Sequence, residues 1–102
     1  MKVYPVRYKW RREDTEGTYY IVAETPEQAE EIAYGCIAAN IFPTPEGPDR
    51  PPEEGRKVDT VWVEDCAAAD TMSTRTGLIG TGSEFYNAKA YAEYIRRTGL
   101  LA

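Results

Sequence analysis

The sequence predicts an α+β fold, with an antiparallel sheet of three to four strands and two helices packed on one face of it. Three patterns predict this class: an N-terminal pair of strand-like segments, a helical segment with a clear N-cap, and a second helical segment before the C-terminus. At 102 residues, 42% of them apolar, the chain has the size of one domain with its own core. The expected order is strand, strand, helix, loop, strand, a further short strand and helix, with both helical stripes buried in a single core.

The first two segments predict a β-hairpin. Residues 2–10 alternate, and one face of the strand would carry Tyr4, Val6, Tyr8 and Trp10, with Val3, Pro5, Arg7 and Lys9 on the other. Residues 18–24 are rich in the aromatic and β-branched residues that strands favour. Pro5 has no N–H to donate, so we expect the first strand to lie at a sheet edge or to be bulged near its start.

The first helix is predicted from its cap. Thr25 suits the N-cap, Pro26 the first helical position and Gln28 the third position of a capping box. The residues at helical spacing that would face the core are Ala29, Ile32, Ala33, Cys36 and Ile37. We expect Asn40 and Pro43 to end the helix.

The middle of the chain is less regular. Residues 43–56 hold five of the seven prolines and predict an exposed loop, and residues 57–64 alternate as a third strand. Residues 66–69 favour a helical turn and residues 71–74 a fourth strand.

The second helix is expected to follow a glycine-rich break at residues 77–82, with a capping box at residues 81–84. Its inward residues would be Phe85, Ala88, Ala92 and Ile95, with Tyr91 and Tyr94 beside them. Gly99 is placed to stop the helix in the left-handed conformation.

The chain has no histidine, which excludes Ser-His-Asp and Cys-His catalysis and any histidine-ligated metal site. Adjacent carboxylates such as those of Glu30 and Glu31 do not face each other on a helix and do not indicate an acid–base pair. We therefore expect no enzyme, no catalytic residues, no metal and no cofactor. An enzyme that uses carboxylates or tyrosine is the alternative that stays open.

Cys36 and Cys66 lie thirty positions apart and belong to no CxxC motif. We interpret both as reduced, buried thiols, with a disulfide or a reactive thiol as the alternatives.

No apolar run reaches the length of about 20 residues that spans a bilayer, and the N-terminus has no signal-peptide pattern. A cytoplasmic location away from membranes is the expectation.

Charge is strongly segregated along the chain. Residues 1–12 carry five basic and no acidic groups, residues 13–70 carry fifteen acidic and three basic groups, and residues 71–102 carry four basic and two acidic groups. If the acidic elements share a side, they form a surface suited to a basic protein partner. Tyrosines are favoured at protein interfaces, and the chain has many of them. The predicted partner-binding residues are therefore eight acidic residues and one tyrosine: Glu13, Asp14, Glu16, Tyr20, Glu27, Glu30, Glu31, Glu53 and Glu54.

The strand-to-helix junction at residues 21–29, Ile-Val-Ala-Glu-Thr-Pro-Glu-Gln-Ala, is similar to the openings of many small phage- and plasmid-encoded proteins, among them some anti-CRISPR inhibitors. The resemblance covers about residues 18–39. It implies an inhibitor that occupies the nucleic-acid-binding surface of a host effector. The resulting hypothesis is a non-catalytic protein-binding module.

The sequence leaves two other kinds of binding and self-association to consider. The glycine-rich residues 77–83 precede a helix, so the alternative function is a small-molecule or nucleotide-binding domain that uses this turn. Direct nucleic-acid binding by the basic first strand is not expected, because Tyr8 and Trp10 are assigned to the core. The opposite charges of the termini and the middle would permit self-association into a homo-oligomer.

Overall fold

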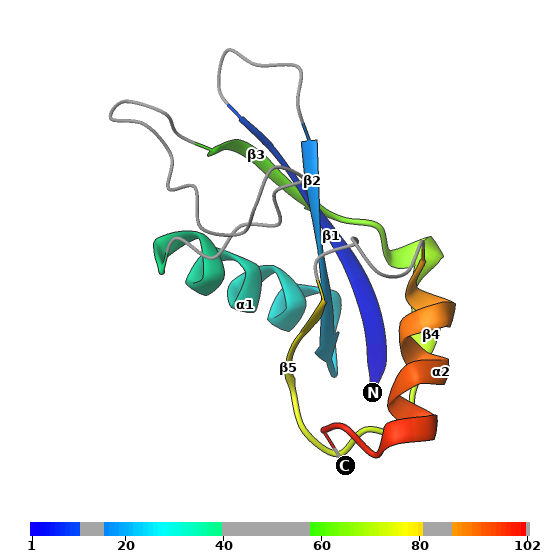
Figure 1. Ribbon diagram of the computed structural model, residues 1–102. Helices are drawn as coiled ribbons and strands as arrows, with labels where there is room; N and C mark the ends of the chain where they lie inside the picture. Colours follow the sequence, from blue (N-terminus) through cyan, green and yellow to red (C-terminus); the bar gives the residue numbers. More distant parts are fainter. Residues whose placement is uncertain (11–15, 40–57, 81–86, 102) are drawn as a thin grey trace.

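The computed structural model describes residues 1–10, 16–39, 58–80 and 87–101, and the predicted α+β class is confirmed (Figure 1). The predicted loop at residues 43–56, Asn40, Pro43, Phe85 and the predicted capping box at residues 81–84 lie outside these ranges. Among the described residues, no helix has the length and apolar character required to cross a membrane.

The sheet is antiparallel and is built around the first strand. β1 (Lys2–Trp10) pairs with β2 (Glu16–Ala23), which confirms the predicted hairpin. On its other side β1 pairs with β3 (Val58–Val63) and then with the two-residue strand β4 (Ala69–Asp70). A fifth strand, β5 (Gly77–Gly80), pairs with β2, so the strand order is β3-β1-β2-β5.

The expectation that β1 lies at an edge or is bulged near its start is wrong, because β1 lies between β2 and β3 and its register shift falls between Lys9 and Trp10, near its end. The Pro5 carbonyl accepts a hydrogen bond of 2.9 Å from the N–H of Glu64. In a strand the nitrogen and the carbonyl of one residue face the same neighbour. The Pro5 nitrogen therefore faces the gap between β3 and β4, where the chain leaves the sheet as the 3₁₀ helix η1 (Asp65–Ala67). The Glu64 carbonyl, which would face an N–H at position 5, accepts instead from the N–H of Ala67 at 3.0 Å.

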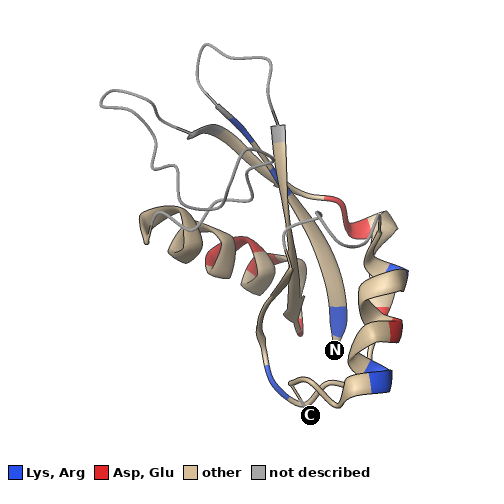
Figure 2. Cartoon of the chain, viewed as in Figure 1, with Lys and Arg blue, Asp and Glu red and all other residues tan. Residues whose placement is uncertain are grey.

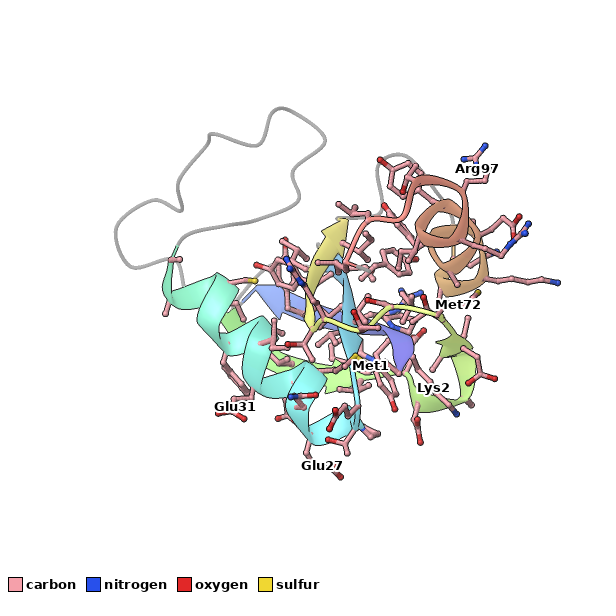
Figure 3. The ribbon with its side chains drawn as sticks, turned by 90° about the horizontal axis from the view of Figure 1, so that it is seen from below. Met1, Lys2, Glu27, Glu31, Met72 and Arg97 are labelled. Carbon is pink, nitrogen blue, oxygen red and sulfur yellow. The ribbon has the colours of Figure 1, made fainter. Side chains whose placement is uncertain are left out.

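The two helices lie on opposite faces of the sheet, so the prediction that both pack on one face is wrong. α1 (Pro26–Ala38) buries Ala29, Ala33 and Cys36 against the face that carries Tyr4, Val6, Tyr8, Tyr19 and Ile21. α2 (Ala88–Thr98) buries Ala88, Tyr91 and Ile95 against the face that carries Val3, Tyr20 and Val22. Figure 3 shows the strands running between the two helices. The physical reason is that residues 19–23 are continuously apolar, as is usual for a strand covered on both faces.

The segment between β4 and β5 also differs from expectation, because residues 71–74 form no strand. Ser73 is buried, and its hydroxyl lies 2.7 Å from the carbonyl oxygen of Leu101. The backbone N–H groups of Thr74 and Arg75 donate to the same carbonyl, at 3.0 and 3.1 Å. These three groups therefore hydrogen-bond to Leu101 and not to a neighbouring strand.

The helix caps follow the sequence at the start of α1 and at the end of α2. The Thr25 hydroxyl accepts a hydrogen bond from the N–H of Gln28 at 3.1 Å, as predicted. Gly99 ends α2 with a positive φ of 71°, also as predicted. Ala39 is the C-cap of α1. The start of α2 differs, because Asn87 is its N-cap and accepts from the N–H of Ala90 at 2.9 Å.

Truncating Ile95 is expected to destabilise the fold more than truncating Ile32. Ile95 is 2% exposed in the core between α2 and the sheet, whereas Ile32 is only partly buried beside the small core residues of α1. We expect Ile95→Ala to lower the free energy of unfolding by about 3 kcal/mol and Ile32→Ala by under about 2 kcal/mol. Urea denaturation of both variants measures the difference. Equal losses would contradict the assignment of these helix faces.

Stability is expected to fall at alkaline pH. Burial raises the pKa of the Tyr4, Tyr19 and Tyr20 phenols, of which Tyr19 is completely buried. Above pH of about 10 the unfolded chain releases phenolic protons that the folded chain keeps, so each such group costs up to about 1.4 kcal/mol per pH unit. Urea midpoints between about pH 8 and pH 11 should decline. Tyr19→Phe should make the decline shallower, and a flat profile would exclude this linkage.

Candidate functional site

The candidate site is the solvent-facing side of α1. Glu27, Glu31 and Tyr34 are exposed and follow one another at intervals of four and three residues, which places them on one line along the helix. Glu30 is partly buried and precedes Tyr34 by four residues, so it flanks this line. We call Glu27, Glu30, Glu31 and Tyr34 the α1 stripe.

The opposite side of α1 fixes the stripe in place. Ala29 and Ala33 are fully buried, and their small side chains let the helix approach the sheet closely. The N-cap adds a second constraint, because the Gln28 side chain accepts a hydrogen bond of 2.7 Å from the N–H of Glu24 at the end of the hairpin. Figure 3 shows Glu27 and Glu31 projecting from α1 away from the strands. The stripe is therefore held on a rigid element.

The charged side chains of the α1 stripe are all acidic. α1 carries three carboxylates and no basic residue (Figure 2). Among the residues that the structure describes, none of these carboxylates forms an ion pair. Glu64 differs, because its carboxylate lies 2.7 Å from Nε of Arg7. The charge on α1 is thus left for an external cation.

The other predicted partner-binding residues do not all join this surface. Glu13, Asp14, Glu53 and Glu54 lie outside the described residues, and for Glu16 the structure places only the backbone, at the start of β2. The remaining predicted residue, Tyr20, lies in β2.

Tyr20 is only 6% exposed, and its ring stacks on that of Tyr91 with 4.4 Å between centroids. The prediction that its ring belongs to an exposed surface is therefore wrong. β2 is covered on both faces, so no side chain of its apolar run reaches solvent.

Tyr34, which is 51% exposed, is the aromatic residue of the stripe. It is not among the residues predicted from the sequence, where the second strand and the second helix hold most of the tyrosines. Its position seven residues after Glu27, opposite Ala29 and Ala33, was the available signal.

Only residues 77–80 of the glycine-rich segment lie within the described residues, and they do not form a turn. Residues 77–80 form β5, and α2 begins only after Asn87. A Cβ at Gly80 would lie 2.2 Å from Cε1 of Tyr91, so this glycine is needed because the ring packs on the strand. The alternative of a phosphate site at this turn loses the helix N-terminus on which it depended.

The two cysteines differ in exposure. Both thiols are free, and Cys36 is buried in the core beneath α1, where burial raises its pKa. Cys66 is exposed in η1, so the prediction that both are buried is wrong for this one. η1 lies where the chain leaves the sheet, and none of its three residues is buried. Within the described ranges, no three His, Cys, Asp or Glu side chains come together as a metal site.

Comparisons with protein-family models, with curated protein sequences and with solved structures gave no significant match to this chain.

Proposed function

We propose that this chain is a non-catalytic protein-binding module that presents the α1 stripe to a basic partner protein. The observation that carries the proposal is the combination, on one side of α1, of a half-exposed tyrosine and three carboxylates that form no ion pair with another described residue. Carboxylates supply attraction and orientation, and an aromatic ring supplies apolar contact area with few torsions to freeze. The buried Ala29 and Ala33 support the proposal because they make the surface preorganised.

The partner class follows from charge. A surface with carboxylates and no cation attracts a surface rich in arginine and lysine, and such surfaces are typical of nucleic-acid-binding proteins. By occupying that surface the chain would act as an inhibitor in the cytoplasm, which is also what the resemblance of residues 18–39 to openings of phage- and plasmid-encoded inhibitors implies.

Affinity capture from a host lysate at two salt concentrations tests the proposal. Charge-driven association weakens steeply between ionic strengths of about 0.05 M and about 0.5 M, because the screening length shrinks severalfold. We expect one stoichiometric basic protein that is retained at low salt, released at high salt and displaced by nucleic acid. A column that retains no basic protein at low salt would contradict the proposal.

A further inference from the structure

A second charged surface lies on the other side of the sheet. α2 exposes Lys89, Glu93, Arg96 and Arg97, and the side chains of Glu93 and Arg96 pair with each other. In the described part of the chain Lys89 and Arg97 form no ion pair. This surface is therefore net basic where α1 is net acidic, and Figure 3 shows Arg97 projecting away from the sheet on the side opposite Glu27 and Glu31.

A groove runs beside these cations. It has a volume of about 360 Å³ and lies between α2, which contributes Lys89, Ala92, Glu93 and Arg96, and the chain at residues 69–72. Met72 lines it and is 77% exposed. Two carboxylates, those of Asp70 and Glu93, also line the groove, and the Glu93 carboxylate pairs with Arg96.

The two surfaces are complementary in apolar contact as well as in charge. Tyr34 and Met72 are the two most exposed large apolar side chains of the described residues, and they lie on the two opposite surfaces. A methionine sulfur at an aromatic ring is a favourable contact.

We propose that a second copy of this chain docks its α1 stripe on the α2 groove. Tyr34 of one copy packs against Met72 and Ala92 of the next, and Glu27 and Glu31 face Lys89 and Arg97. Because the two surfaces differ and lie on opposite sides, the contact is head-to-tail and leaves one surface free at each end. Self-association then covers the α1 stripe and competes with any other basic partner.

Sedimentation velocity of the full chain tests this inference. We expect the mean mass to rise above the 11.5 kDa of the monomer with increasing concentration at an ionic strength of about 0.02 M, and to return to it at about 0.5 M. A chain that stays monomeric at millimolar concentration and low salt would overturn the inference.

Two charge variants make the test specific. Glu27→Lys with Glu31→Lys removes the acidic surface, and Lys89→Glu with Arg97→Glu removes the basic one. Each variant alone should associate at least about tenfold more weakly than the wild-type chain. Their equimolar mixture should associate again, because the native stripe of one variant meets the native groove of the other and the two reversed surfaces also carry opposite charge. A mixture that stays monomeric, or single variants that associate like wild type, would overturn the inference.

Substitutions of the uncharged side chains in the proposed contact give a second test. Tyr34→Ala and Met72→Ala alter exposed side chains that the core does not need, and each should weaken self-association about tenfold while the melting temperature is kept. Unchanged association in both would also overturn the inference. Self-association can fail while salt-sensitive capture of a foreign basic protein persists, and the reverse can also occur, so this inference and the proposed function are decided separately.

Discussion

The triple variant Glu27→Lys, Glu30→Lys and Glu31→Lys is expected to lose capture of the basic partner altogether. All three side chains lie on or beside the outward line of α1, and none of them forms an ion pair with another described residue. Reversal replaces three attractions with three repulsions, and like charges facing each other across an interface cost several kcal/mol. A loss of at least about a thousandfold in affinity, measured by titration calorimetry with the captured partner, is the expected result.

A charge-matched control separates the stripe from net charge. Asp65, Asp70 and Glu93 are exposed acidic residues outside α1, and changing all three to lysine alters the net charge by the same amount. This control should keep partner binding within about tenfold of wild type, because only diffuse attraction is lost. Circular dichroism must show that α1 is intact in both proteins. Equal binding by the two variants would contradict a site on α1.

The second large effect is expected on stability, from Gly80→Val. A Cβ at this position would lie 2.2 Å from Cε1 and 2.5 Å from Cζ of Tyr91. The ring has no room to withdraw, since Tyr91 is 2% exposed and stacks on Tyr20, the cross-strand neighbour of Gly80. Accommodating the side chain must displace α2 or part β5 from β2, at a cost of about 3 kcal/mol or more.

Gly35→Ala is the matched control for this prediction. Nothing lies within 4 Å of a Cβ at Gly35, which is exposed within α1, so alanine should stabilise the helix by about 0.5–1 kcal/mol.

In a Tyr91→Ala background, Gly80→Ala should cost far less than in the wild-type chain, because the obstructing ring is gone. Thermal or urea unfolding of these variants and of the wild-type chain provides the comparison. A wild-type melting temperature for Gly80→Val would show that the ring does not pack on β5.

The amino-acid sequence by itself determined the elements whose signals are local. α1 begins where Thr25, Pro26 and Gln28 predict it, because a cap is decided by hydrogen bonds over three residues. The hairpin and the stop of α2 at Gly99 follow in the same way from alternation and from the left-handed freedom of glycine. The acidic side of α1 could also be predicted, since helical spacing separates Glu27 and Glu31 from Ala29 and Ala33.

Only the tertiary structure decided which face of the sheet each helix covers. Periodicity assigns side chains to two faces of a strand, but it does not say whether one face or both will be buried. That choice placed Tyr20 in the core beneath α2 and left Tyr34 as the aromatic residue of the α1 stripe. It also set the acidic α1 and the basic α2 on opposite sides of the molecule (Figure 2).

The strand β5 was likewise decided by tertiary contacts. Gly-Leu-Ile-Gly has the composition of a turn, and glycine weakens an isolated strand. Here the edge of β2 supplies the hydrogen bonds, while Leu78 and Ile79 pack into the two cores on either face. Gly80 leaves space for the ring of Tyr91, and Gly17 does the same for Tyr8 on the other face. A glycine that a distant aromatic ring requires carries no sign of that ring in its own neighbourhood of the sequence, because the two meet only when the chain has folded.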